Sequence, residues 1–248
     1  MDIFRVGDRP VTDVDGLLGR AIDRDRNGAS LLIELDPGAR LDRPGLEVFL
    51  LEGAVELDGR RLGPRDFLLL GGRATVLAPT RAIAWVPDRE PLGIHRVQAA
   101  SGADWRQPAL GSTAGMLFRP LRSEEHVDEV DGKRVTGSPR GFRRLTCLAP
   151  GWSERRCEVH AECREENILL AGDLLVCGHG RGVMRPGSVL VNEIGLRHGP
   201  MATRRGAVLL ISCDSWMSVG WHPAPEADLA QIDRYLGGGP GWLDRAGA

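Results

Sequence analysis

The sequence lacks several features that would point to particular partners or compartments. Its 32 basic and 34 acidic residues are spread along the chain and give a formal net charge of −2. A protein that neutralises phosphates needs a basic stripe, so we expect no nucleic-acid partner. No apolar run approaches the ~20 residues that span a bilayer, and residues 1–16 lack the basic start and apolar core of a signal peptide. We therefore expect a soluble, cytoplasmic protein with no membrane partner.

Cysteine is too sparse and too irregular to build a cross-linked framework. The five cysteines form no Cys-x-x-Cys pair, and their number is odd. Both facts argue against a disulfide framework and against a zinc site made of thiolates. Four of the five fall in or just before the histidine-bearing stretch described below, which leaves a redox or ligand role open. The simpler interpretation is that they are small core residues on strands.

What the sequence has in abundance is glycine and proline, with 33 and 16 residues. They interrupt short leucine- and valine-rich runs about every 8–12 residues, with turn signals at residues 36–38 and 58–59. This pattern predicts an all-β sandwich or barrel. Residues 223–236 differ, because Leu229, Ile232 and Leu236 are spaced like one face of a short helix, which the following Gly-Gly-Gly-Pro would end.

The second half of the chain repeats the first. Residues 35–38 have a counterpart at 148–151, and the segment that ends at Gly53 has one that ends at Gly172. The offset between the copies grows along the chain, as loop insertions would make it. We therefore predict two copies of one β-unit, at residues 1–100 and 126–222, joined by a polar connection at 101–125 and followed by a helix and tail at 223–248.

The chemistry-bearing residues cluster in the second copy. His160-x-Glu162-x-x-x-Glu166 precedes an apolar run, and His198 follows a Pro-Gly turn and another apolar run. Alternate residues of a strand point to one face, so Glu158, His160 and Glu162 should project together. Burying several acids without a counter-ion is costly, and a metal ion is the usual solution. Two nitrogen and two oxygen donors suit Fe(II), Mn(II), Zn(II) or Ni(II), so we predict one divalent ion held by His160, Glu162, Glu166 and His198.

The assignment of the carboxylates leaves alternatives open. Glu162 could orient a histidine instead of binding the ion, with Glu165 or Glu158 in its place. Glu166 is preferred to Glu165 because its place in the second copy corresponds to that of Glu47 in the first. Whichever of Glu162 and Glu165 is not a ligand is the candidate catalytic base.

Substrate-binding residues are predicted only from their nearness to the site in the sequence. An arginine beside the ion would suit an anionic or carbonyl-bearing substrate. Spacing does not fix the direction in which these side chains point. The candidates are Arg155, Arg185, Asn192 and Arg197.

With these residues in view, the chain resembles the cupin superfamily over almost its whole length, as a bicupin. The first cupin motif is HxHxxxE followed by a strand and a glycine, which residues 160–166 resemble, with Glu162 in place of the second histidine. The second motif is Pro-Gly, a strand and a histidine, which residues 186–198 resemble. Within cupins the chain is most similar to the ChrR-type branch, in which a paired-glutamate motif and His-Gly-Pro are frequent. The resemblance implies two jelly-roll β-barrels in tandem.

The first copy departs from the cupin pattern. It has Leu41, Arg43 and Leu77 where ligands are expected, and it keeps only Glu47. One carboxylate beside leucines and an arginine is a poor site for a divalent cation. We expect a degenerate, structural barrel in the first copy and a homodimer for the whole protein.

The resemblance implies a metal-dependent enzyme that acts on a small organic molecule. Cupins of this kind include dioxygenases that cleave diketone-like or phenolic substrates, as well as isomerases, decarboxylases and cyclases. Two alternatives stay open: a ChrR-like zinc-binding regulatory module and a metal-free ligand-binding bicupin. ChrR-type anti-sigma factors carry an N-terminal helical zinc domain with a His/Cys motif. Nothing like it precedes residue 30, so the enzyme is the preferred expectation.

Overall fold

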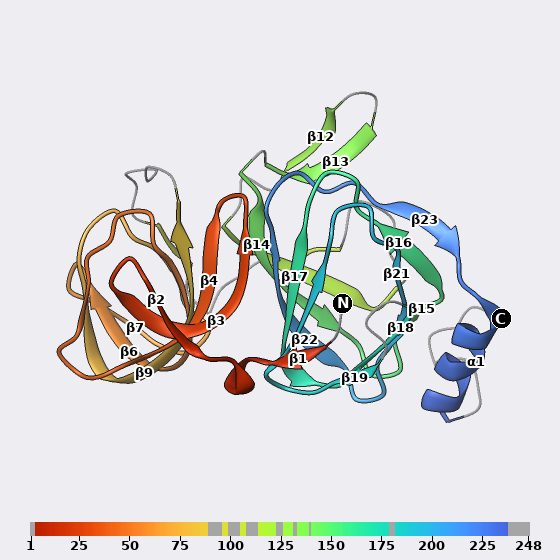
Figure 1. Cartoon of the computed structure of the whole chain (residues 1–248), viewed down its shortest axis with the longest axis horizontal. Helices are drawn as coiled ribbons and strands as arrows, with labels where there is room; N and C mark the ends of the chain where they lie inside the picture. The colour runs from red at the N-terminus through yellow and green to blue at the C-terminus, as the bar shows by residue number, and fades with distance from the viewer. Residues whose placement is uncertain are drawn as a thin grey trace. The chain divides into compact units, whose positions relative to one another are not determined.

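The protein is built almost entirely of β-strands (Figure 1). The computed structural model describes residues 3–88, 96–98, 105–107, 114–122, 126–130, 133–138, 140–178 and 182–237. Strands make up 60% of the structure and helices 7%, which confirms the predicted all-β class. The chain divides into two compact units, residues 6–104 and residues 1–5 with 105–248. The prediction treated residues 101–125 as a connection, but β11 (Met116–Arg122) lies there and belongs to the second unit.

The first unit is a single curved sheet of nine strands in the order β10-β8-β6-β9-β4-β3-β2, with β5 beside β9 and β7 beside β6. A short 3-10 turn, η1 (Val6–Asp8), precedes it. Its longest pairing joins β6 and β9 through three register shifts. The strands are β2 (Val11–Val14), β3 (Leu17–Asp25), β4 (Gly28–Leu35), β5 (Arg40–Leu41), β6 (Glu47–Leu57), β7 (Arg60–Leu62), β8 (Phe67–Leu69), β9 (Ala74–Pro87) and β10 (Arg96–Gln98).

The core of the first unit is aliphatic, and the four positions that correspond to the cupin ligands do not meet in it. Leu41 is part of this core, whereas Leu77 is 41% exposed. Arg43 forms an ion pair with Asp15 at 2.7 Å. Glu47 is buried, but its neighbours Leu46 and Val48 both belong to the core, so Glu47 projects from the other face of β6.

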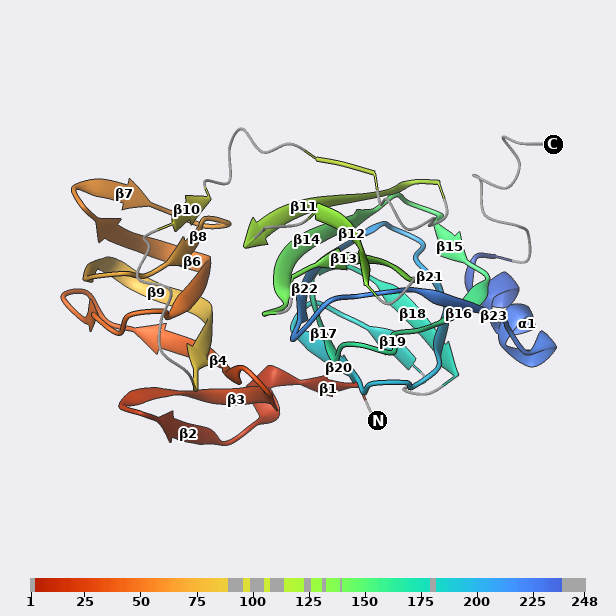
Figure 2. The same ribbon diagram turned by 90° about the horizontal axis from the view of Figure 1, so that it is seen from above.

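The second unit is a jelly-roll built from two facing sheets (Figure 2). One sheet has the order β1-β20-β17-β22-β14-β11, and the other β19-β18-β21-β16-β23 with β15 beside β21. A separate hairpin pairs β12 with β13. The remaining strands are β1 (Phe4–Arg5), β12 (His126–Val130), β13 (Lys133–Gly137), β14 (Phe142–Leu148), β15 (Ser153–Glu154), β16 (Arg156–Val159), β17 (Glu165–Gly172), β18 (Leu174–Gly178), β19 (Gly182–Met184), β20 (Ser188–Asn192), β21 (His198–Ala202), β22 (Ala207–Cys213) and β23 (Gly220–Pro223).

The glycines that mark the repeat are required by the backbone. Gly53 and Gly172 have φ of +88° and +83°, the left-handed region in which side chains are strained. A Cβ at Gly53 would lie 2.3 Å from the carbonyl oxygen of Pro79, and one at Gly172 would lie 1.8 Å from that of Gly206. Both copies therefore have glycine at a point where the backbone of the neighbouring segment lies too close for a side chain.

The predicted C-terminal helix is confirmed as α1 (Glu226–Tyr235). Its buried Ile232 packs on Leu175, Cys177 and Ala202, which lie on the outer face of β18 and β21. No helix in the described part of the chain has the length and apolar character needed to cross a membrane. All five cysteines are free thiols, and all but Cys147 are buried.

Candidate metal centre

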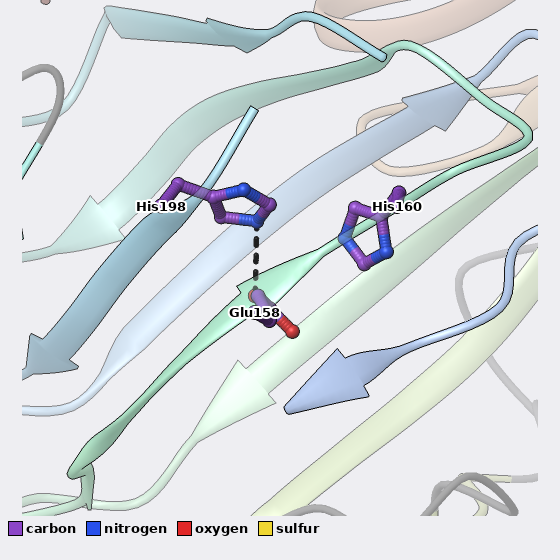
Figure 3. A group of neighbouring side chains, drawn as sticks. All are labelled: Glu158, His160 and His198. Atoms are coloured by element: carbon purple, nitrogen blue, oxygen red, sulfur yellow. Dashed lines mark ion pairs between the residues drawn. The ribbon is translucent and has the colours of Figure 1, made fainter. Parts of the chain in front are cut away.

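Two imidazoles and a carboxylate converge inside the second unit. Glu158 of β16 lies directly opposite His198, the first residue of β21, and His160 follows the end of β16. The Nε2 atom of His198 is 3.2 Å from Oε1 of Glu158. One donor atom from each of the three residues lies within 4.8 Å of the others. Figure 3 shows the three side chains turned toward a common space.

The orientation of each imidazole is fixed by the main chain. Nδ1 of His160 lies 2.8 Å from the carbonyl oxygen of Ser218, and Nδ1 of His198 lies 3.1 Å from that of Leu196. A carbonyl only accepts, so each Nδ1 carries a hydrogen, and Nε2 of each ring faces the cluster, where it offers a lone pair whenever the ring is neutral. Both Nε2 atoms are buried and make no hydrogen bond by geometry, although Oε1 of Glu158 lies 3.2 Å from Nε2 of His198 and forms an ion pair with the ring when it is protonated. Unpartnered buried nitrogens of this kind are costly unless a ligand completes them.

Glu165 supplies a second carboxylate. Its Oε2 atom is 3.8 Å from Nε2 of His160 and 3.6 Å from Nε2 of His198. The same oxygen accepts hydrogen bonds from the side-chain amides of Asn167 and Asn192, both at 2.9 Å. Burial alone would raise the pKa of Glu165, but the two imidazoles and the two amides lower it to about 2. Glu165 is therefore a carboxylate at any ordinary pH.

The four residues fit a divalent ion. Donor atoms about 2.1 Å from one ion lie roughly 3.0–3.4 Å apart at octahedral or tetrahedral angles. Three of the donor–donor separations, 3.2, 3.6 and 3.8 Å, are in or slightly above this range, and the donor atoms of Glu158, His160 and His198 all lie within 4.8 Å of one another. Side-chain shifts would bring the four donors onto one ion. Two carboxylates would also balance the charge of the ion.

Two of the predicted ligands lie elsewhere. The β16 strand ends at Val159, so strand alternation does not extend to Glu162. Glu162 instead accepts hydrogen bonds from the backbone N–H, at 3.2 Å, and the hydroxyl of Ser218. Because the carbonyl of Ser218 fixes His160, Glu162 supports the orientation of that imidazole.

Glu166 is buried, but it projects away from the imidazoles. Glu165 and Asn167, its neighbours on β17, both line the cavity, so alternation places Glu166 on the opposite face. Glu47 of the first unit likewise projects away from the aliphatic core. The repeat therefore paired Glu47 with Glu166 correctly, but both side chains lie on the outer face of their strand.

The cavity around the cluster has a volume of about 80 Å³, enough for several water molecules. Most of its wall is apolar and includes Trp152 and Met217. At one edge the half-exposed guanidinium of Arg156 stacks 3.9 Å from the ring of Trp221 and pairs with Glu154. An apolar lining with a few convergent polar groups is typical of sites that bind small organic molecules.

Of the four predicted substrate-binding residues, one lines the cavity. Asn192 does so, while Arg155 pairs with Asp233 of α1 at 2.7 Å, and Arg185 and Arg197 are exposed. The cavity instead contains Arg144 of β14, which the sequence reasoning missed. Alternation along residues 142–148 would have grouped Arg144 with Thr146, but no local signal says that this face borders the site.

The stability of the metal-free protein should depend on pH through His198. Burial alone would lower the pKa of His198, but contact with Glu158 and the charge of Glu165 raise it from 6.5 to about 9. The proton therefore stabilises the folded state fully below pH 6.5, and this contribution is lost as the pH rises toward 9. We expect the free energy of unfolding to fall by a few kcal/mol over this interval, measured by urea denaturation.

The matched control for this pH dependence is His198→Gln, which should lose most of the slope. A metal ion and the His198 proton compete for the same nitrogen. The affinity of the wild type for metal should therefore rise between pH 6.5 and 9, where the stability of the metal-free protein falls. A metal-free wild type whose stability does not change between pH 6.5 and 9 would contradict the arrangement.

Comparison with protein-family models gives no match, and no curated protein matches the chain. Solved structures do match. A candidate dioxygenase from Nostoc punctiforme has a TM-score of 0.68 at 15% identity and covers 90% of this chain and 87% of its own. Protein YlbA from Escherichia coli has a TM-score of 0.59 at 11% identity, covering 86% and 89%. A variant of oxalate decarboxylase from Bacillus subtilis has a TM-score of 0.50 at 14% identity, covering 95% and 84%.

These neighbours are cupin-fold proteins, so the likeness confirms the predicted cupin fold over most of the chain. At such identities it shows the fold alone. The resemblance to the ChrR-type branch stays a prediction.

Proposed function

We propose that the second unit is a metal-dependent enzyme domain that acts on a small organic molecule. The observation that carries the proposal is the pair of buried, unpartnered Nε2 atoms of His160 and His198, directed at two carboxylates inside a largely apolar cavity. A structural histidine pair would be expected to satisfy both ring nitrogens within the protein. Titratable groups gathered in a cavity in this way mark a reactive site.

In this proposal the ion is held by His160, His198, Glu158 and Glu165. A bound Fe(II), Mn(II), Zn(II) or Ni(II) would polarise a substrate oxygen, and Fe(II) would also support chemistry with dioxygen. Glu165 accepts hydrogen bonds from the side-chain amides of Asn167 and Asn192, which makes it a weak base. The Glu158 side chain is 18% exposed, so it is the carboxylate placed to exchange a proton with a substrate. The apolar wall keeps bulk water from the reacting atoms.

The reaction class that we propose is dioxygenase-type, or the related isomerase or cyclase chemistry. The test uses the Fe(II)-loaded protein with panels of 1,3-diketones, phenols and 2-oxo acids, in air and under argon. We expect substrate loss with matching oxygen uptake. Equal substrate loss under argon would exclude the oxygenase and favour an isomerase or cyclase. Turnover that survives chelation and the His160→Ala substitution would contradict metal dependence altogether.

Metal removal should lower the thermal stability of the second unit. A ligand present at 1,000 times its Kd stabilises the folded state by about 4 kcal/mol, which corresponds to roughly 8–16 °C for a unit of this size. Differential scanning fluorimetry with and without EDTA measures the difference. If none of the four metal ions shifts the melting temperature, the metal-free ligand-binding alternative is favoured instead.

A further inference from the structure

Two polar side chains line the cavity without a hydrogen-bond partner and take no part in the proposed metal centre. Thr146 and Trp152 are each 1% exposed, and both line the cavity. Within the part of the chain that the structure describes, neither Oγ1 of Thr146 nor Nε1 of Trp152 makes a hydrogen bond. A buried donor without a partner destabilises the folded state. Two such donors on one cavity wall therefore point to a ligand that completes them.

The strand register places Thr146 at the end of the cavity away from the metal ligands. Thr146 of β14 pairs with Leu209 of β22, whereas Glu165 of β17 pairs with Cys213 of the same strand. Four residues along a strand correspond to about 13 Å. Thr146 therefore lies well beyond the row of strand positions that contains Glu165.

Trp152 reaches the same end of the cavity from the facing sheet. Its carbonyl accepts a hydrogen bond from the backbone N–H of Thr203 at 2.9 Å, and the next residue, Ser153, pairs with Ala202. Ala202 lies four residues after His198 on β21, which again corresponds to about 13 Å. Both sheets thus place an unpartnered donor at a similar distance along the strands from the proposed metal centre.

Apolar side chains from both sheets line the cavity between these two ends. Ile211 lies between the positions of Leu209 and Cys213 on β22, and Met201 lies between His198 and Ala202 on β21. A ligand that extends from the metal centre to Thr146 and Trp152 would therefore pack its middle part against carbon.

The chemistry of the two donors defines the group that they would bind. The indole N–H of Trp152 only donates, and the hydroxyl of Thr146 both donates and accepts. An oxygen that accepts hydrogen bonds would complete both. An anion would exchange its hydration for two neutral donors, which is costly, whereas a ketone, ester or hydroxyl oxygen loses much less. The donors therefore match a neutral oxygen.

We propose that Thr146 and Trp152 are specificity-determining residues that bind a neutral oxygen at the end of the substrate remote from the ion. The substrate class is an elongated, largely apolar molecule with one oxygen group at the metal centre and a second, neutral one several bonds away. This inference rests on the proposed function and narrows it, because a short 2-oxo acid carries both of its oxygen groups at one end.

The experiment compares matched probes by calorimetric titration of the Zn(II)-loaded protein. Each probe is a straight-chain hydroxamic acid of about five to nine carbons, a length set by the ~13 Å spacing along the strands less the side chains at both ends. The hydroxamate anchors the probe on the ion, and the far end carries a methylene, a ketone or a carboxylate. An apolar wall alone would favour the methylene. We expect the ketone to bind about 10-fold more tightly than the methylene at one chain length, and more tightly than the carboxylate.

Isosteric variants assign this preference to the two donors. Thr146→Val and Trp152→Phe should each reduce the ketone-to-methylene affinity ratio several-fold, and the double variant should abolish the preference. The ratio is the readout because a change of cavity shape affects both probes. Trp105→Phe, which alters a 42% exposed residue outside the cavity lining, should keep the wild-type ratio. A wild type that favours the methylene or the carboxylate at every length, or a double variant that keeps the ketone preference, would overturn the proposal.

A stability measurement on the metal-free protein tests the premise without any ligand. Thr146→Val replaces an unpartnered hydroxyl with a methyl group, so its melting temperature should equal or exceed that of the wild type. The contrasting variant is Thr203→Val, because the buried hydroxyl of Thr203 donates to Asp173 at 2.7 Å. Thr203→Val should melt several degrees lower. An equal loss in both variants would show that the Thr146 hydroxyl is satisfied within the protein and would overturn the proposal.

Failure of the proposed function has a different signature. If Zn(II) does not bind, the hydroxamates lose their anchor, but 2-heptanone added to the metal-free protein still tests the two donors. The indole N–H signal that disappears in Trp152→Phe identifies Trp152 in the nitrogen–proton correlation spectrum. A downfield shift of this signal with added ketone, reduced in Thr146→Val, supports the proposal. A signal that does not move up to the solubility limit of the ketone overturns it.

Discussion

Replacing His198 with alanine should lower the affinity of the protein for divalent metal by well over 100-fold. Removal of a group that only orients a ligand typically costs 10–100-fold, and His198 is itself a proposed ligand with an Nε2 atom directed at both carboxylates. His160→Ala should have the same effect, since its Nε2 atom is the other unpartnered nitrogen. Metal content after equilibrium dialysis measures both variants.

The matched control for the histidine variants is His222→Ala. His222 lies on β23, paired with β16, but does not line the cavity. It should retain the metal content of the wild type. Full metal occupancy in both His160→Ala and His198→Ala would show that the ion, if any, is bound elsewhere.

Exchanging the two neighbouring glutamates for glutamine should give opposite results. Glu165→Gln removes the carboxylate that lies within 4 Å of both imidazoles, so metal affinity should fall by about 100-fold or more. Glu166→Gln changes a buried residue on the other face of β17, so metal affinity should change less than about 3-fold, even if stability falls. Isothermal titration calorimetry with Zn(II) compares the two variants, normalised to folded protein. Retention of affinity by Glu165→Gln together with its loss in Glu166→Gln would restore the assignment predicted from the repeat.

The features that the sequence predicts well are those fixed by local backbone geometry. Gly53 and Gly172 occupy left-handed conformations beside a neighbouring carbonyl, so both copies retain them, and the repeat is visible from short segments. The spacing of Ile232 and Leu236 reflects the single apolar face that α1 packs on the barrel. The left-handed φ of the glycines and the spacing of the helix act within a few residues and leave a direct pattern in the sequence, although the carbonyls beside the two glycines come from a neighbouring segment.

The details of the site depend on where strands end and which face turns inward. The sequence does not show that β16 stops at Val159, and this stop removes Glu162 from the alternating set. A difference of one residue separates Glu165 from Glu166, yet it moves a carboxylate from the cavity to the outer face. Arg144 is 21 positions before Glu165 in the chain and meets the site only because β14, β22 and β17 are adjacent. Sequence spacing carries no information on that pairing.

The most direct test of a single metal site in the second unit is the anomalous scattering of crystals grown with saturating Zn(II). One peak is predicted, bonded to Nε2 of His160 and His198 and to the carboxylates of Glu158 and Glu165. A peak at Glu47 or Glu166, bonding through Nδ1 of either histidine, or crystals with no bound ion would contradict the account.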